Sequence, residues 1–193
     1  MKLLKGEDIL KKNKIYFGTS NKNKVKEATA VLTLHGIKLL HYPIERVEIQ
    51  SDDLNEIAVY SLKNINDSVP IVVEDAGLFI NRLKGFPGPY SSYVLEHLGN
   101  PGILKLMDNV EDRSAKYVSA VAYRDDSEVH VFQGIVEGNI TLNIIGTNGF
   151  GFDPIFIPNE GDGRTFGEMS DVEKNSISHR SRAFNALGKW LTQ

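Results

Sequence analysis

Residues 70–78 read Pro-Ile-Val-Val-Glu-Asp-Ala-Gly-Leu, an apolar run that ends in two adjacent carboxylates. The β-branched residues 71–73 show no polar alternation, which is typical of a strand covered on both faces. We expect this strand to end at Glu74 and Asp75, because ligand clefts in α/β sheets open at the carboxyl ends of strands. Two carboxylates at such a place are candidates for a divalent-cation site and a general base. Glu-Asp-Ala-Gly is also common in ordinary turns, so the pair alone leaves both interpretations open.

The segments before this strand predict parallel α/β structure. Apolar residues at helical spacing predict helices over 21–35 and 53–66. Strands are expected at 14–19, 37–42 and 70–75. This order of strand, helix and strand is typical of βαβ units.

The second half of the chain predicts antiparallel structure. Alternating residues at 116–124 and 128–135 predict a hairpin that turns at 125–127 and extends towards residue 145. The other elements expected here are a rigid loop over 85–90, short helices over 91–98 and 102–110, and a final helix over 178–191. The predicted fold class is therefore α/β, with a mixed sheet, two lobes and a cleft between them.

The composition of the chain limits the number of domains, the chemistry and the partners that we expect. The chain has 193 residues, 41% hydrophobic and 24% charged, which fits a single globular domain over residues 1–193. It has no cysteine, so disulfides, thiolate metal sites and cysteine nucleophiles are excluded. The net charge of −3, with no run of Lys or Arg after residue 26, disfavours a stable nucleic-acid partner. No apolar stretch approaches ~20 residues, and the first one is too short for a signal peptide, so we expect a cytoplasmic protein without a membrane partner.

Residues 19–24, Thr-Ser-Asn-Lys-Asn-Lys, join the first expected strand to the first helix. Free N–H groups at a helix N-terminus bind anions, and Thr19, Ser20 and Asn21 add side-chain donors. Lys24 lies one turn into the helix and can turn back towards a phosphate. The alternative interpretation is a polar cap followed by a solvated lysine face, because Ser and Asn are common caps.

Residues 149–154, Gly-Phe-Gly-Phe-Asp-Pro, form a second candidate segment. Glycine lets the backbone approach a ligand closely, and Phe150 or Phe152 can stack on a nucleobase. Asp153 can accept a hydrogen bond from a ring N–H. The alternative is a hydrophobic plug, because phenylalanine in a loop usually packs into the core.

Residues 174–180 open the last helix and concentrate donors in Lys174, Ser178, His179 and Arg180. Ser178 is a good N-cap. A cationic first turn opposes the helix dipole, and such a local conflict points to a functional role. A surface turn with an incidental histidine is the alternative.

Glu48 precedes the second expected helix and is a candidate to join Glu74 and Asp75 around a metal ion. Glu45 in the same segment is expected to be solvated. Oxygen ligands without His or Cys favour Mg²⁺, or Mn²⁺, over Zn²⁺.

Taken together, these segments resemble the inosine triphosphate pyrophosphatase family, the house-cleaning nucleoside triphosphatases. The resemblance runs from about residue 14 to residue 191. The motifs that carry it are Thr19-x-Asn21-x-x-Lys24, Glu74-Asp75-x-Gly77-Leu78, Gly85-x-Pro87-Gly-Pro-Tyr90, Phe150-Gly-Phe-Asp153-Pro-Ile-Phe and Lys174-x-x-x-Ser178-His-Arg180. Each motif is weak alone, but five in the family's order and spacing are specific.

The resemblance implies an elongated mixed-sheet α/β fold with two lobes and a deep central cleft. It implies hydrolysis of non-canonical purine triphosphates such as ITP, dITP and XTP to the monophosphate and pyrophosphate, which removes damaged nucleotides from the pool. A Mg²⁺ cofactor (with Mn²⁺ as a substitute), a small-molecule nucleotide substrate and a homodimer are implied as well.

The resemblance also assigns roles to single residues. Asp75 is the implied general base, and Glu48, Glu74 and Asp75 are the implied metal ligands. The implied substrate-binding residues are Thr19, Ser20, Asn21, Lys22, Asn23, Lys24, Ala76, Phe150, Gly151, Phe152, Asp153, Lys174, His179 and Arg180.

Two positions depart from the family's pattern. Many relatives have Ser or Thr where Ala76 stands, so only a backbone N–H is offered to a phosphate here. Some relatives have a basic residue where Ser92 stands, so one cationic contact is missing or comes from elsewhere.

A different class of function, a non-catalytic module that binds a nucleotide or single-stranded nucleic acid, also fits the stacking pair Phe150 and Phe152.

Overall fold

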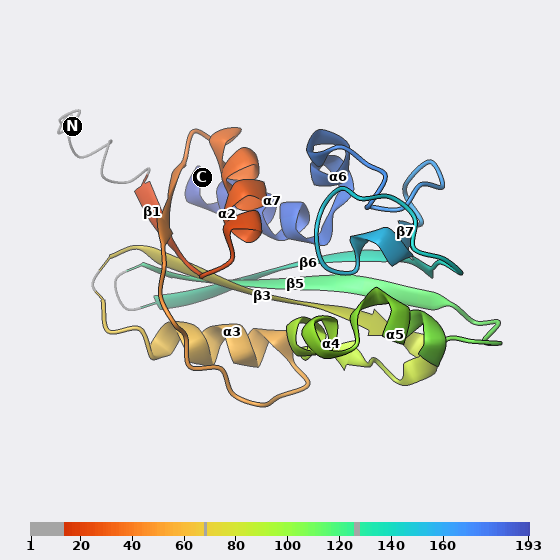
Figure 1. Ribbon diagram of the computed structural model, residues 1–193. Helices are drawn as coiled ribbons and strands as arrows, with labels where there is room; N and C mark the ends of the chain where they lie inside the picture. The colour runs from red at the N-terminus through yellow and green to blue at the C-terminus, as the bar shows by residue number, and fades with distance from the viewer. Residues whose placement is uncertain (1–13, 68, 126–127) are drawn as a thin grey trace, which may run out of the picture.

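The computed structural model describes residues 14–67, 69–125 and 128–193, so the N-terminal segment and part of the expected turn at 125–127 lie outside the described residues. Its strands are β1 (Lys14–Gly18), β2 (Lys38–Tyr42), β3 (Ile71–Ile80), β4 (Pro87–Gly88), β5 (Ser114–Asp125), β6 (Glu128–Ile140) and β7 (Phe156–Pro158). They form a seven-stranded sheet in the order β2-β1-β3-β5-β6-β7, with β4 beside β3 (Figure 1). β1 is parallel to β2 and β3, and the pairs from β3 to β7 are antiparallel, so the predicted mixed sheet is confirmed.

Helices cover both faces of this sheet. They are α2 (Lys22–Thr33), α3 (Leu54–Lys63), α4 (Ser91–His97), α5 (Gly99–Leu106), α6 (Asp171–Ile177) and α7 (His179–Leu191), with 3-10 turns η1 (Asn81–Leu83) and η2 (Asp153–Ile155). α2, α6 and α7 lie on one face, and α3, α4 and α5 lie on the other (Figure 1). None of the helices in the described ranges is both long and apolar enough to cross a bilayer.

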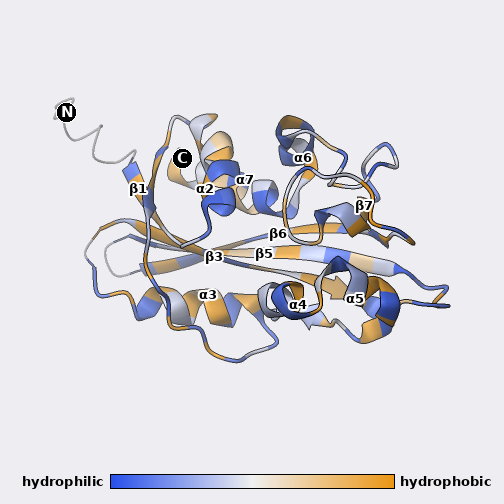
Figure 2. Cartoon of the chain, in the orientation of Figure 1, coloured by the Kyte–Doolittle hydropathy of each residue, from blue (hydrophilic) through white to orange (hydrophobic). Residues whose placement is uncertain are grey.

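The core confirms that residues 71–73 are covered on both faces. Val72 packs with the residues of α2 and α7, whereas Ile71 and Val73 pack with those of α3. Successive side chains of a strand point to opposite faces, so a strand between two helical layers is apolar throughout. Figure 2 shows the result as hydrophobic stretches in the central strands and alternating hydrophobic and hydrophilic bands along α3.

The prediction that this strand ends at Glu74 and Asp75 is wrong, because β3 continues to Ile80. β3 pairs with β5 along its whole length, from Ile71 opposite Arg124 to Ile80 opposite Ala115. Its parallel neighbour β1, by contrast, ends at Gly18 and meets only the first residues of β3. One edge of β3 is therefore left without a strand partner at the level of the two carboxylates. The strand whose carboxyl end lies beside the carboxylates is therefore β1, not β3.

Several other boundaries differ from the predictions. β5 is longer than expected, because β6 completes its hydrogen-bond ladder along its whole length. β6 ends at Ile140, not at residue 145, and α6 was not expected. α6 is a short helix with a capping box formed by Ser170 and Glu173.

Close packing of α7 on β6 sets the position of the last helix. Gly134 lies on β6 under α7, and a Cβ at this glycine would meet the His179 carbonyl and come within 2.7 Å of the Ala183 nitrogen. Backbone cannot yield as a flexible side chain can, so glycine is required here. The first turn of α7 is thereby held against the sheet.

We predict that Gly134→Ala lifts α7 from β6 and lowers the free energy of unfolding by about 1–3 kcal/mol, the usual cost of overpacking. Urea unfolding followed by circular dichroism measures the change. Gln133→Ala, on the exposed face of the same strand, is the matched control and should change stability by less than about 0.5 kcal/mol. An equal effect of both substitutions would contradict the packing argument.

Candidate functional site

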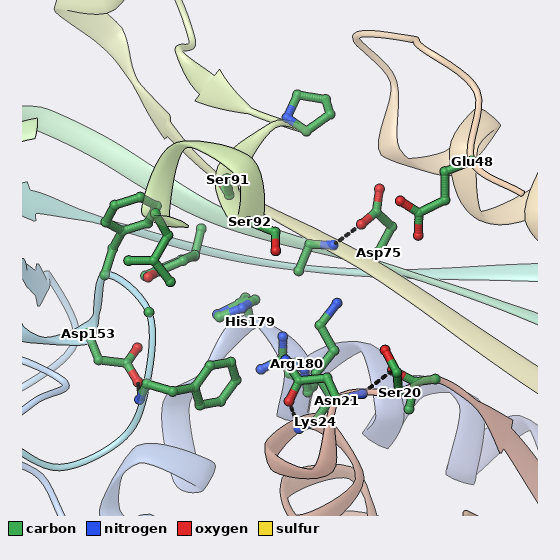
Figure 3. Close-up of a pocket in the computed structure, with 18 of the residues that line it drawn as sticks. Ser20, Asn21, Lys24, Glu48, Asp75, Ser91, Ser92, Asp153, His179 and Arg180 are labelled. Atoms are coloured by element: carbon green, nitrogen blue, oxygen red, sulfur yellow. Dashed lines mark hydrogen bonds between the residues drawn. The ribbon is translucent and has the colours of Figure 1, made fainter. Parts of the chain in front are cut away.

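A pocket of about 380 Å³ lies where β1 ends and β3 continues. It is lined by segments far apart in the sequence, and Figure 3 shows their side chains converging on one space. The lining residues are Thr19, Ser20, Asn21, Lys24, Arg46, Glu48, Asp75, Ala76, Pro89, Ser91, Ser92, Leu95, Tyr117, Phe150, Gly151, Phe152, Asp153, Lys174, His179 and Arg180.

Most of the predicted site residues therefore meet in one place. Lys22, Asn23 and Glu74 are the predicted residues that do not line this pocket, and Asn23 lines a neighbouring cavity. Sequence reasoning did not select Arg46 or Tyr117. Arg46 lies in the same segment as Glu48, so its charge was the available signal, whereas Tyr117 looks like an ordinary strand residue.

The start of α2 forms one wall. Asn21 is the N-cap, and its side chain accepts hydrogen bonds from the N–H groups of Asn23 (2.9 Å) and Lys24 (3.2 Å). Thr19 Oγ1 accepts from the Asn21 N–H at 3.1 Å. The capping interpretation is thus correct for Asn21. It does not exclude anion binding, because α2 has no acidic residue in its first turn and Lys24 faces the pocket.

Asp75 is the carboxylate on the pocket wall. It is 9% exposed, and its own side chain accepts a hydrogen bond from the Ala76 N–H at 3.0 Å. Burial raises the pKa of Asp75 to about 6; Lys24 opposes this rise, and Glu48 adds to it. Figure 3 shows the Glu48 carboxylate directed towards Asp75. A carboxylate that titrates near 6 is ionised at neutral pH yet basic enough to take a proton.

Glu74 lies on the opposite face of β3, and the prediction that it joins a three-carboxylate metal site is not supported. Neighbouring residues of a strand point to opposite faces, so the side chain of Glu74 cannot face the same side of the sheet as that of Asp75. It is fully buried, accepts a hydrogen bond from Ser119 Oγ (2.8 Å) and pairs with Lys24 (2.9 Å) and Arg180 (3.1 Å). Burial acts to raise the pKa of Glu74, but Arg180 and Lys24 outweigh it and hold the pKa well below the ordinary value.

The carboxylates that could hold a metal ion are therefore Asp75 and Glu48. The residues described contain no group of three or more His, Cys, Asp or Glu side chains arranged around a common point. Two hard oxygen donors facing an open pocket still fit Mg²⁺, which keeps several waters and takes phosphate oxygens as further ligands. Burial is the main cause of the raised pKa of Asp75, and the smaller contribution from repulsion by Glu48 is what a bound cation would relieve.

A row of buried charges connects the two ends of the pocket. Beyond Glu74, the row continues through Arg180, which pairs with Glu27 at 2.6 Å. Glu27 pairs with Lys174 at 2.7 Å, and Lys174 pairs with Asp153 at 2.6 Å. Glu27 comes from α2, three residues after Lys24, so both lie on one helix face. Sequence reasoning missed Glu27, although this spacing was a signal for it.

The far end of the pocket combines rings with donors. The Phe150 ring lies 4.6 Å from Lys174 Nζ and 5.4 Å from the Arg180 guanidinium carbon. Asp153 accepts from the Phe150 N–H at 2.7 Å, which fixes the loop. Phe152 packs into the core and also reaches the pocket, so the hydrophobic-plug interpretation is partly correct for it.

His179 is buried and neutral. Its ring stacks on Tyr117 at a centroid distance of 4.4 Å, and its Nδ1 has no hydrogen-bond partner in the described part of the protein. Burial, with Arg180 and Lys174 nearby, holds the pKa of His179 well below its ordinary value. A neutral imidazole with an unpartnered nitrogen can accept or donate one hydrogen bond to a ligand.

Comparisons with known proteins identify relatives of this chain. The model of the Ham1 family matches residues 15–190. A protein of Methanothermobacter marburgensis called dITP/XTP pyrophosphatase is 50% identical over 184 residues, which are 93% of this chain and 97% of that protein. One of the same name from Pyrococcus horikoshii is 44% identical over 180 residues, 92% of this chain and 96% of that protein. The solved structure of a HAM1 protein from Coxiella burnetii has a TM-score of 0.81 at 27% identity, covering 93% of this chain and 98% of that one.

We predict that Glu27→Gln destabilises the fold by about 3–5 kcal/mol, because it leaves Lys174 and Arg180 buried with less counter-charge. Urea unfolding at pH 7 measures the loss. Burial acts to raise the pKa of Glu27, but Arg180 and Lys174 outweigh it and lower the pKa. The stabilisation by ionised Glu27 is therefore present above its unfolded pKa, and the penalty of the variant should shrink as the pH falls below 4.5.

The control for this experiment is Glu160→Gln, which removes the exposed partner of Arg182. Exposed ion pairs contribute little, so its unfolding curve should match that of the wild type. A Glu27→Gln variant as stable as this control would show that the buried row is not needed for folding.

We predict the opposite sign for Asp75→Asn, which should stabilise the metal-free protein at pH 7.5 by up to about 3 kcal/mol. The folded pKa of about 6 lies above the ordinary value of 3.8, so ionised Asp75 destabilises the folded state relative to the unfolded chain. The penalty for ionised Asp75 grows between those two pH values and is complete above 6. Melting curves in EDTA from pH 4 to pH 8 should show the advantage of the variant appearing over that interval. Glu96→Gln, an exposed carboxylate on α4, should show no such trend.

Proposed function

The chain belongs to the Ham1 family, and from this we propose that it hydrolyses non-canonical purine nucleoside triphosphates, dITP, ITP and XTP, to the monophosphate and pyrophosphate. The observation that carries the proposal is the pocket itself. A buried carboxylate with raised pKa and cations stand at one end, and an aromatic ring with buried donors stands at the other. This arrangement of charged groups at one end and an aromatic ring at the other suits a ligand with a charged tail and a flat polar head.

At the ring end, we assign the nucleobase to the space beside Phe150. The exposed face of the ring offers stacking. Lys174, Arg180 and neutral His179 offer donors, which suit the 6-oxygen of hypoxanthine or xanthine. Adenine presents an amine at that position and would leave these donors unpaired. Such a mismatch can lower kcat/KM for the wrong substrate by roughly 10⁴-fold or more.

At the carboxylate end, we assign the triphosphate to the start of α2. The N–H groups of the first turn and Lys24 Nζ favour negative charge there. Ala76 has no hydroxyl, and its N–H already donates to Asp75, so it adds no free donor for the phosphates. Pyrophosphate carries this charge away when the bond between the α-phosphorus and the oxygen that bridges it to the β-phosphorus breaks.

Asp75 is the proposed general base. It takes a proton from the water that attacks the α-phosphorus, and its pKa of about 6 leaves it ionised at neutral pH. A Mg²⁺ ion held by Asp75 and Glu48 would supply charge neutralisation for the phosphates and acidify bound water. Lys24 lies close enough to lower the pKa of Asp75 and so keeps the base ionised when the ion is absent.

The proposal extends to the whole chain. We place one catalytic domain over residues 1–193, with the two parts of the sheet forming lobes around the pocket, and we expect a homodimer in the cytoplasm. Size-exclusion chromatography with light scattering tests the oligomeric state.

We predict that dITP and XTP with Mg²⁺ give pyrophosphate as the first product, detected by a coupled assay that separates it from orthophosphate. GTP, ATP, dUTP and modified pyrimidine triphosphates complete the substrate panel. Asp75→Asn should lower kcat by at least ~10²-fold while dITP binding persists, because it removes proton transfer and keeps the shape of the side chain.

Other outcomes would contradict the proposal. Orthophosphate released first, with the diphosphate intact, would place the cleavage at the wrong bond. Salt-dependent binding of single-stranded nucleic acid without triphosphate turnover would favour the non-catalytic module. Near-normal turnover by Asp75→Asn would remove this residue from the role of base.

A further inference from the structure

Arg46 is a partly buried cation on a segment without regular secondary structure. Residues 43–53 connect β2 to α3, and their side chains alternate between the protein and the solvent from Pro43 to Val47. Ile44 and Arg46 face inwards, whereas Glu45 and Val47 are exposed. The Arg46 side chain is only 11% exposed. A guanidinium turned inwards from a surface segment needs partners that explain its position.

Both partners of Arg46 belong to the carboxylate end of the pocket. Its Nη1 donates to the Glu74 carbonyl at 3.2 Å, on the edge of β3 where β1 has ended. Its Nη2 pairs with Glu48 Oε1 at 2.5 Å. Lys24 Nζ lies 3.5 Å from the same carbonyl, so two cations from different segments converge beside Asp75.

Arg46 is the pocket cation that is held least firmly. Lys24, Lys174 and Arg180 each pair with a carboxylate that is buried. The side-chain partner of Arg46, Glu48, is 48% exposed. Glu48 is also one of the two carboxylates that fit a divalent cation. A metal ion at Glu48 would compete directly with the guanidinium.

The opposite wall of the pocket offers no charge to a phosphate. It consists of Pro89, Ser91, Ser92 and Leu95, and Ser91 already bonds the Leu78 N–H and the Gly88 carbonyl. The cations at this end therefore come from the side of Lys24 and Arg46. Arginine suits the outer phosphates because its planar fork binds two oxygens at once.

We propose that Arg46 exchanges partners during the reaction cycle: it pairs with Glu48 in the empty enzyme and, once a divalent cation takes Glu48, binds the β- and γ-phosphates that leave as pyrophosphate. This inference rests on the proposed function for the identity of the leaving group. It assigns to Arg46 the cationic contact that Ser92 does not supply. It also makes the guanidinium a competitor of the metal ion before substrate arrives.

The exchange predicts effects of opposite sign in Arg46→Gln. Mn²⁺ binding to the metal-free protein, measured by electron paramagnetic resonance, should tighten by up to about fivefold, since a half-exposed ion pair that competes with it is gone. Binding of inorganic pyrophosphate in the presence of Mg²⁺, measured by calorimetry, should weaken by about 10–100-fold, the effect of one lost charge-assisted contact. Binding of inosine monophosphate should change by less than about twofold.

Two further variants make the test specific. Arg46→Lys keeps the charge but not the fork, so its affinity for pyrophosphate should fall between those of the wild type and Arg46→Gln. Glu45→Gln changes an exposed neighbour on the same segment and should alter none of the three affinities.

Three results would overturn the proposal. Unchanged or weaker Mn²⁺ binding in Arg46→Gln would show that Arg46 does not compete for Glu48. Unchanged pyrophosphate binding would remove Arg46 from the leaving group. Equal loss of pyrophosphate and inosine monophosphate binding would show a structural role alone. Failure of the proposed function would instead appear as an absence of dITP or XTP turnover by the wild type. The three binding measurements do not depend on turnover, so the two failures can be told apart.

Discussion

Six side chains of alternating charge run beneath the pocket, and the position of nearly every functional group depends on them. The row comprises Lys24, Glu74, Arg180, Glu27, Lys174 and Asp153. Each buried charge would be costly alone, so each one requires its neighbours. In some proteins such networks define one arrangement more than they add to total stability. Here that arrangement keeps the donors of α6 and α7 aimed into one space, and it joins both ends of the pocket.

The pocket exists because two parallel strands differ in length. β1 ends at Gly18, while β3 continues to Ile80 along its antiparallel partner β5. The edge left open on β3 receives Lys24 and Arg46 at the Glu74 carbonyl. Because alternate residues of a strand face opposite sides, the adjacent carboxylates have separate environments. Glu74 lies among cations and stays ionised, whereas Asp75 faces the pocket beside Glu48 and has a pKa of about 6.

Local patterns predicted much of this protein correctly. The apolar residues 71–73 indicated a strand covered on both faces, and the helices at α2, α3 and α7 follow from apolar residues at helical spacing and from the caps Asn21, Asp53 and Ser178. Strand ends were predicted less well. Whether β3 stops at Asp75 depends on β5, whose Ala120 pairs with Asp75 from a distant part of the chain, and the local pattern does not show that pairing.

The sequence by itself determined which residue types are present at the site, because each belongs to a short motif that can be recognised on its own. Examples are Lys24, Asp75, Phe150 and Arg180. Only the tertiary structure decided how these residues divide their roles. It paired Glu74 with Arg180, brought Glu27 from α2 to Lys174, and turned Arg46 inwards onto Glu48. The most distant of these partners, Glu27 and Lys174, are 147 positions apart, and the sequence around a charged residue does not show which partner it will have once it is buried.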